Sequence, residues 1–222
     1  MEIKENIEQV KKDIEKYSKN PKKVTLLVVT KYVGNEEVKE VLESGNNNLG
    51  ENRVQVLEEK IEKFGTENVN WHFIGNLQRN KVKYIADYIT MIHSVSSFRL
   101  AEEINKQAIK KGRIIDILLE VNISGEESKS GFSIDELKEK IKKIEKMPNI
   151  NIKGLMTMAP YLNEEEKIRK VFIGLRELRD ELNDGYLENK ILELSMGMSN
   201  DYKIALEEGA TIIRLGSQIF KK

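Results

Sequence analysis

The feature that most constrains the fold is an alternation, repeated along the chain, of short apolar runs with amphipathic helical patterns. The first apolar run, VTLLVVTKY at 24–32, is rich in β-branched side chains and has helical patterns on both sides, which is typical of a parallel strand covered on both faces. Runs of the same character predict seven further strands, around Leu49 and at 71–74, 88–93, 114–123, 152–158, 191–196 and 211–215.

Eight strands alternating with helices, at about thirty residues per unit, predict an α/β fold of the (β/α)8 TIM-barrel type. An open doubly wound sheet has the same alternation and is the alternative fold. The apolar spacing within Ile3–Tyr17 predicts an extra amino-terminal helix. We expect this helix to cover the part of the barrel where the helix after the eighth strand is nearly missing. No linker or repeat interrupts the pattern, so residues 1–222 are expected to form a single domain.

Composition disfavours several classes of function. The 37 lysine and arginine residues balance 37 aspartate and glutamate residues, and a net charge of zero argues against a broad nucleic-acid interface. The chain has no cysteine, which excludes disulfides and thiolate catalysis, and its two histidines leave little for a metal site. No uncharged apolar stretch reaches membrane-spanning length, and the charged first twenty residues do not resemble a secretory signal. We therefore expect a cytoplasmic protein with no membrane partner and no metal.

Polar side chains collect where the predicted strands end. Because the carboxyl ends of barrel strands meet at one face, these residues are candidates for chemistry. They are Lys31, Glu51, Asn52, Asn76, His93, Ser94, Asn122, Thr157, Ser195, Ser199, Arg214, Gly216 and Ser217. Acid pairs are scarce among them, which disfavours glycosidase chemistry. A structural role is favoured for His72, whereas His93 is open to either a structural or a functional role.

The loops after the last two predicted strands are the most informative. The segment 195–201 (SMGMSND) contains a glycine for a tight turn followed by Ser199, and the segment 214–217 (RLGS) places Gly216 and Ser217 directly after the eighth strand. Backbone N–H groups and hydroxyls in these two loops often form the phosphate site of a barrel. The alternative is two ordinary turns, with Ser199 as a helix N-cap.

A phosphate site beside a strand-end lysine suggests Schiff-base chemistry. A partly desolvated Lys31 loses its proton more readily and can then condense with an aldehyde. Pyridoxal phosphate carries both an aldehyde and a phosphate, and Arg214 would face its pyridine nitrogen, which an arginine keeps unprotonated. The alternatives are a lysine that turns to solvent and a barrel-end ion pair of Arg214 with Glu51 or Glu193.

Eight stretches of the sequence match one family. They are VVTK ending at Lys31, GENRVQ at 50–55, WHFIGNLQRNK at 71–81, HSVSS at 93–97, VNISGEESKSGF at 121–132, GLMTM at 154–158, LSMGMSND at 194–201 and IRLGSQIF at 213–220. Through these stretches the chain closely resembles the pyridoxal-phosphate homeostasis proteins, also called the proline synthase co-transcribed family. The resemblance extends over nearly the whole chain, in the order of the family.

The resemblance implies one barrel like the amino-terminal domain of bacterial alanine racemase, which is a fold type III pyridoxal-phosphate barrel. It implies pyridoxal 5'-phosphate held as an aldimine by Lys31. The phosphate would be bound by Ser199 and by the turn formed by Gly216 and Ser217, with Arg214 near the pyridine nitrogen.

The resemblance also assigns roles to several further residues. It places Asn52 close to the cofactor ring, and it implies that Met158 and Ser195 line the cofactor pocket. Lys129, in the long loop after the fifth strand, matches a lysine that the family uses in handling the cofactor. The alternative for Lys129 is a solvated loop lysine.

The family implies a carrier that stores, buffers or delivers pyridoxal phosphate without robust catalysis, with apo pyridoxal enzymes as further partners. Racemases of this barrel type use a tyrosine base from a separate β-domain, for which the sequence leaves no room, and we expect a monomer. One alternative is an amino-acid racemase or related pyridoxal enzyme that uses His93, Tyr32 or Tyr161 as its base. Another is a barrel enzyme that acts on a phosphorylated metabolite without a Schiff base.

Overall fold

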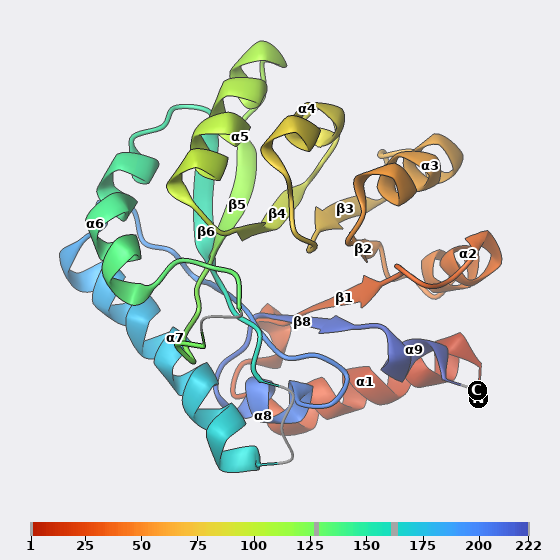
Figure 1. Cartoon of the computed structure of the whole chain (residues 1–222). Helices are drawn as coiled ribbons and strands as arrows, with labels where there is room; N and C mark the ends of the chain where they lie inside the picture. The colour runs from red at the N-terminus through yellow and green to blue at the C-terminus, as the bar shows by residue number, and fades with distance from the viewer. Residues whose placement is uncertain (1, 127–128, 161–163, 222) are drawn as a thin grey trace.

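The computed structural model describes residues 2–126, 129–160 and 164–221. Within these ranges, eight parallel strands close into a barrel in sequence order, and β1 pairs with β8 to complete it (Figure 1). The strands are β1 (Thr25–Val29), β2 (Asn48–Glu51), β3 (Asn70–Phe73), β4 (Met91–Val95), β5 (Ile115–Glu120), β6 (Ile150–Met156), β7 (Glu193–Ser195) and β8 (Ile212–Leu215). The predicted (β/α)8 barrel is confirmed, and the open sheet is excluded because a closed barrel has no edge strands.

Helices surround the barrel on its outer side (Figure 1). They are α1 (Ile3–Tyr17), α2 (Asn35–Glu43), α3 (Val54–Phe64), α4 (Val82–Ile85), α5 (Phe98–Lys110), α6 (Ile134–Glu145), α7 (Glu165–Gly185), α8 (Tyr202–Glu207) and α9 (Ser217–Phe220), with short 3-10 turns η1 (Pro21–Lys23) and η2 (Arg79–Lys81). No helix in the described ranges combines the length and the apolar character that a membrane crossing needs.

The extra helix α1 packs against α8 and α9, beside the carboxyl-terminal end of the chain (Figure 1). The side-chain amide of Asn6 donates to the carbonyl oxygens of Ile219 and Lys221 at 2.8 and 3.0 Å. The hydroxyl of Tyr202 donates to a carboxylate oxygen of Asp13 at 2.5 Å. The expected role of the first helix is confirmed: α1 covers the side of the barrel next to the short α9.

The strands have two apolar faces because successive side chains point to opposite sides of a strand. One set of side chains joins the helices in a large outer core, while Leu27, Met91, Leu118, Met156 and Ile212 form a separate inner cluster inside the barrel. Each fully buried aliphatic side chain contributes roughly 1.5–3 kcal/mol relative to exposure. Two positions further along β4, β5 and β8, towards their carboxyl ends, the buried side chains are His93, Glu120 and Arg214, and this is where the candidate site begins.

The first strand is shorter than the sequence suggests. β1 ends at Val29, and the N–H of Val33 donates to the carbonyl oxygen of Thr30 at 3.2 Å, which closes a turn. Lys31 and Tyr32 are the two central residues of this turn, so Lys31 follows the strand rather than ending it. The β-branched run predicted the strand correctly, but it carried no signal for the turn.

The run at 88–93 also differs from its prediction. The N–H of Ile89 donates to the carbonyl of Ile85 at 3.0 Å, so this part continues the turn of α4. β4 begins only at Met91 and continues to Val95, past the predicted end. A short apolar run cannot by itself distinguish a helix end from a strand start.

A buried ion pair ties α3 to the strands beneath the candidate site. The Nζ of Lys60 on α3 donates to a carboxylate oxygen of Glu51 at 2.5 Å and to the backbone carbonyl of Thr30 at 2.6 Å. The hydroxyl of Thr30 donates to the same oxygen of Glu51 at 2.5 Å. Lys60 and Glu51 are both buried. The residue immediately before Lys31 is therefore held through its side chain and its backbone.

Replacing Lys60 should be strongly destabilising, because Lys60→Met leaves the carboxylate of Glu51 buried without its cationic partner. We expect the free energy of unfolding to fall by about 3–5 kcal/mol, measured by urea denaturation followed by circular dichroism. Lys63→Met on the exposed face of the same helix is the matched control and should change stability by less than about 0.5 kcal/mol. Equal stabilities for the two variants would contradict the role given to the ion pair.

Candidate functional site

The predicted site residues lie at the carboxyl ends of neighbouring strands. Because β8 pairs with both β1 and β7, the segments that follow these three strands adjoin at one rim of the barrel. Lys31 follows β1, Ser199 follows β7, and Gly216 and Ser217 follow β8. The barrel thus brings together the predicted lysine and both predicted phosphate loops.

Lys31 is exposed at this rim. Its Nζ lies 4.8 Å from the centre of the Tyr32 ring, and Tyr32 is 83% exposed. A cation over an aromatic face is a weak interaction at such an exposed position, worth about 0.5–1 kcal/mol. The amine is therefore accessible, while the backbone just before it is fixed by the contacts of Thr30 with Glu51 and Lys60.

The two predicted phosphate loops contact each other. Gly197 has a φ of +93°, a conformation that favours glycine, and it allows the sharp turn after β7. The hydroxyl oxygen of Ser199 accepts a hydrogen bond from the N–H of Gln218 at 3.2 Å. Ser199 is not the N-cap of α8, since Asp201 occupies that position. The geometry therefore differs from two independent turns: Ser199 connects the loop after β7 to the start of α9.

Gly216 lies where the backbone of β1 comes close. A Cβ atom at this position would lie 3.2 Å from the carbonyl oxygen of Val29. A side chain here would therefore press on the strand that leads to Lys31. Glycine leaves the backbone of the turn open on the rim.

Arg214 is buried inside the barrel. Its guanidinium donates to the hydroxyl of Ser195 at 2.8 Å and to the backbone carbonyl of Thr157 at 3.0 Å. Burial lowers the pKa of Arg214 to about 10, and the nearby carboxylates of Asp201 and Glu120 oppose this effect. The arginine therefore stays charged at neutral pH.

The ion pairs considered as an alternative for Arg214 are absent among the described residues. Glu51 bonds to Thr30 and Lys60, and Glu193 accepts a hydrogen bond from the hydroxyl of Thr211. Neither carboxylate bonds to Arg214.

Both histidines lie inside the barrel and are neutral. Nδ1 of His93 lies 2.8 Å from the Ser195 hydroxyl, and Nε2 of His93 lies 2.9 Å from Nδ1 of His72. Burial lowers the pKa of His72 to about 4; burial, then His72 and Arg214, lower the pKa of His93 well below its usual value. An irregularity in the pairing of β4 with β5 falls between Ile92 and Val95, beside His93. Such bulges re-aim side chains next to functional sites.

The remaining predicted residues lie at the rim with different degrees of exposure. Asn52 follows β2 and is half-buried, and its backbone packs so closely on Gly75 that a Cβ there would lie 2.1 Å from the Asn52 carbonyl oxygen. Met158 follows β6 and is exposed. Lys129 lies in the loop between β5 and α6, with its Nζ shielded from solvent and 3.4 Å from a carboxylate oxygen of Glu126. This differs from a freely solvated lysine.

Sequence reasoning missed two carboxylates near Arg214. Glu120 is buried at the end of β5, accepts a hydrogen bond from the hydroxyl of Ser130 at 2.6 Å, and has its pKa raised by burial. Asp201 accepts from the N–H of Met198 at 2.6 Å, and burial also raises its pKa. An acidic residue that ends an otherwise apolar strand run was the available signal for Glu120.

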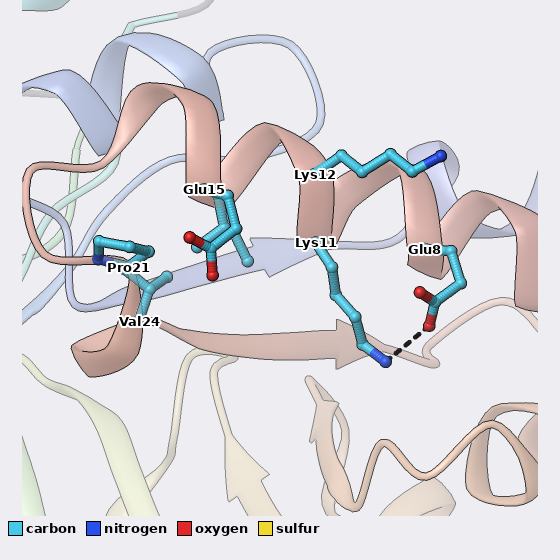
Figure 2. Close-up of a pocket in the computed structure, with 7 residues that line it drawn as sticks. Glu8, Lys11, Lys12, Glu15, Pro21 and Val24 are labelled. Atoms are coloured by element: carbon cyan, nitrogen blue, oxygen red, sulfur yellow. Dashed lines mark hydrogen bonds and ion pairs between the residues drawn. The ribbon is translucent and has the colours of Figure 1, made fainter.

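One pocket of the structure lies apart from this rim. A pocket of about 440 Å³ is formed by α1 and the segment before β1, at the amino end of that strand (Figure 2). Its charged lining is partly self-paired, since Lys11 bonds to Glu8, and it contains none of the predicted residues. Within the described ranges, no cluster of three or more potential ligand side chains is placed to hold a metal ion.

Comparison with known proteins is consistent with this geometry. The family model for the alanine racemase N-terminal domain matches residues 2–222. A pyridoxal phosphate homeostasis protein from Aquifex aeolicus is 42% identical over 214 residues, which cover 96% of this chain and 93% of that protein.

Solved structures show the same fold. PipY of Synechococcus elongatus PCC7942, without pyridoxal phosphate, superposes with a TM-score of 0.91 at 30% identity and covers 99% of this chain and 100% of its own. The structure of PipY with pyridoxal phosphate bound gives a TM-score of 0.89 at 29% identity, with the same coverage. Alanine racemase from Clostridium difficile 630 shares the fold alone, with a TM-score of 0.78 at 15% identity over 98% of this chain and 56% of that one. The chain therefore belongs to the alanine racemase N-terminal domain family, and within it to the pyridoxal phosphate homeostasis proteins.

Proposed function

We propose that this chain binds pyridoxal 5'-phosphate covalently through Lys31 and takes part in homeostasis of the cofactor, as a carrier that stores, buffers or delivers it. The observation that carries the proposal is the placement of an exposed lysine at the same rim as Ser199, Gly216 and Ser217, with the buried cation of Arg214 on the strand between them. The structure of the relative PipY with pyridoxal phosphate bound matches 99% of this chain, which supports the same cofactor here.

The residues at the rim fit the chemistry of this cofactor. Pyridoxal phosphate supplies an aldehyde that reacts with an amine, a phosphate dianion and a pyridine ring whose nitrogen accepts hydrogen bonds. Lys31 offers an accessible amine. Ser199 and the turn of Gly216 and Ser217 offer hydroxyl and backbone donors to the phosphate. A Cβ at position 216 would crowd the Val29 carbonyl, so the glycine lets this turn lie close against β1.

Arg214 can donate a hydrogen bond to the pyridine nitrogen without transferring a proton to it. A guanidinium has five N–H donors and no acceptor. Ser195 and Thr157 use two of these donors, and among the described residues the others have no partner, which leaves them for the pyridine nitrogen. Because the arginine remains charged, it keeps that nitrogen unprotonated, which makes the ring a weaker electron sink. A weaker sink suits holding the cofactor better than racemising an amino acid.

The candidate bases for a racemase differ in their placement. His93 is buried and both of its ring nitrogens are occupied by hydrogen bonds, so it is not available at the exposed rim. Tyr32 lies at the rim beside Lys31. Tyr161 lies outside the described residues. Asn52, Met158 and Lys129 remain proposed as residues around the cofactor ring and its entry path.

We further propose that residues 1–222 act as one cofactor-binding domain, as a monomer in the cytoplasm, and that apo pyridoxal enzymes receive the cofactor. The exposure of Lys31 and of the neighbouring Tyr32 supports transfer, because a partner can reach the amine without the barrel opening.

Lys31→Ala should abolish covalent cofactor binding. We expect the wild-type protein to gain the visible absorbance of lysine-bound pyridoxal phosphate, and borohydride reduction followed by peptide mass spectrometry to place the pyridoxyl group on Lys31. Lys39→Ala, at an exposed lysine of α2, is the control and should behave like the wild type. A wild-type protein that shows no such absorbance at saturating cofactor would rule out the proposal.

Ser199→Ala should weaken retention of the cofactor because a hydroxyl donor to the phosphate is lost. One hydrogen bond to a charged group is worth about 1.5–3 kcal/mol, so Kd should rise by roughly ten- to hundredfold in equilibrium dialysis. Competition by inorganic phosphate should weaken in parallel. The control is Ser44→Ala at the end of α2, on the opposite face of the barrel; an equal effect of both variants would point to a general loss of structure.

The cofactor-loaded protein should not exchange the α-proton of common amino acids in deuterated water faster than free pyridoxal phosphate does, as followed by proton NMR. Exchange well above that level, lost in Tyr32→Phe, would instead establish a racemase-type enzyme with Tyr32 as its base.

A further inference from the structure

Four buried side chains form a chain of hydrogen bonds across the barrel interior. Arg214 on β8 donates to Ser195 on β7, whose hydroxyl contacts Nδ1 of His93 on β4, and Nε2 of His93 contacts Nδ1 of His72 on β3. Nε2 of His72 is buried and has no hydrogen-bond partner among the described residues. This hydrogen-bond chain has the charged guanidinium of Arg214 at one end and the unpartnered Nε2 of His72 at the other, and this asymmetry determines where its protons lie.

One arrangement of protons uses nearly every group in the chain. Arginine only donates, so the oxygen of Ser195 accepts from Arg214, and the single hydroxyl proton of Ser195 can be donated to Nδ1 of His93. His93 then carries its proton on Nε2 and donates it to Nδ1 of His72. His72 in turn carries its proton on Nε2. Both rings are neutral, and the N–H of His72 is the one donor left without a partner.

The reverse arrangement leaves more groups unsatisfied. If Nδ1 of His93 donated to Ser195, the serine oxygen would accept twice, and its own proton would have no acceptor within the described residues. The ring N–H would also point its positive end toward the cation of Arg214. Each buried group without a partner costs about 1–3 kcal/mol, so the first arrangement is favoured.

The charges around this hydrogen-bond chain favour the same arrangement of protons. The carboxylates of Glu120 on β5 and Asp201 in the loop after β7 stabilise the positive form of Arg214. The charge of Arg214 and the proximity of His72 add to burial in lowering the pKa of His93. Neither ring therefore carries a second proton at neutral pH, and in the favoured arrangement the Nδ1 lone pair of each ring faces the arginine end of the hydrogen-bond chain.

We propose that His93, supported by His72, is a positioning residue that orients the hydroxyl of Ser195 and thereby holds Arg214 in a fixed orientation for the pyridine nitrogen of the cofactor. This inference rests on the proposed function. Thr157 holds a second nitrogen of the guanidinium, so the plane of Arg214 is defined at two points. A donor that is already oriented loses less conformational freedom when the ligand binds.

Nitrogen-15 NMR of the cofactor-free protein tests the proton arrangement independently of cofactor binding. The chain has only two histidines, so each ring can be assigned from a single variant. We expect both rings to be protonated on Nε2 and unprotonated on Nδ1. Because burial lowers the pKa of His72 to about 4, neither ring should titrate above about pH 5. A proton on Nδ1 of His93, or a titration near the ordinary histidine range, would overturn the proposal.

Two variants of His93 test the positioning role. His93→Leu removes the acceptor for the Ser195 hydroxyl and should raise Kd for pyridoxal phosphate about five- to hundredfold in equilibrium dialysis. Borohydride trapping on Lys31 should still occur at saturating cofactor. His93→Asn offers a side-chain oxygen near the position of Nδ1 and should recover a large part of the affinity.

The outcomes separate this inference from the proposed function. If wild-type protein forms no adduct on Lys31, the proposed function fails while the NMR result still decides the proton arrangement. If the adduct forms but His93→Leu binds like the wild type, or His93→Asn binds no better than His93→Leu, the positioning role fails. Should His93→Leu not fold, the tautomers of the wild-type protein and the affinity of His93→Asn remain as tests.

Discussion

The closure of β1 against β8 is the constraint on which the rest of this structure depends. It removes the sheet edges, and the side chain of every strand residue then points either to the helix-covered outer core or into the barrel interior. The interior holds an apolar cluster that includes Leu27 and Ile212, and two positions further along β8 it holds Arg214. A single cation is thereby placed in a low-dielectric interior, where it needs oriented partners.

Barrel closure also arranges the residues of the site in layers. Behind the strands, the ion pair of Lys60 and Glu51 secures the backbone of Thr30. Within the barrel, Ser195 and Thr157 offer neutral acceptors to two N–H groups of Arg214, and no carboxylate of the described residues pairs directly with its charge. At the rim, Lys31 and Tyr32 meet solvent. Rigid parts are thus buried and the reactive amine is not, which is the arrangement a carrier needs for loading and release.

The fold was predictable because its signals are local and repeated. Eight apolar runs alternating with helical stripes identified the barrel, and the residues after these runs identified the rim that carries Lys31, Ser199 and Gly216. Bounds were less predictable: a turn around Lys31 and a helix end at Ile89 lie within apolar runs and carry no distinct pattern.

Hydrogen-bond partners on different elements were not predictable, for a different reason. The contact of Lys60 with Glu51 joins two neighbouring elements, and that of Ser195 with His93 spans 102 positions, so neither leaves a periodic trace in the sequence. His72 was expected to be structural, but nothing in the pattern indicated its contact with His93. The arginine partners first considered, Glu51 and Glu193, were acids near strand ends; the carboxylates that act on Arg214 electrostatically are Glu120 and Asp201.

The exposure of Lys31 has a consequence for selectivity. An amine open to solvent has no steric means of distinguishing one cellular aldehyde from another. Under the proposed function, discrimination would come from groups that the aldehyde itself does not touch: Ser199, Gly216 and Ser217, which would bind a phosphate, and Arg214, which would bind a ring nitrogen. Aldehydes that lack both groups would form short-lived adducts, so Lys31 would react with many aldehydes while the barrel mouth would retain only those that carry a phosphate and a ring nitrogen.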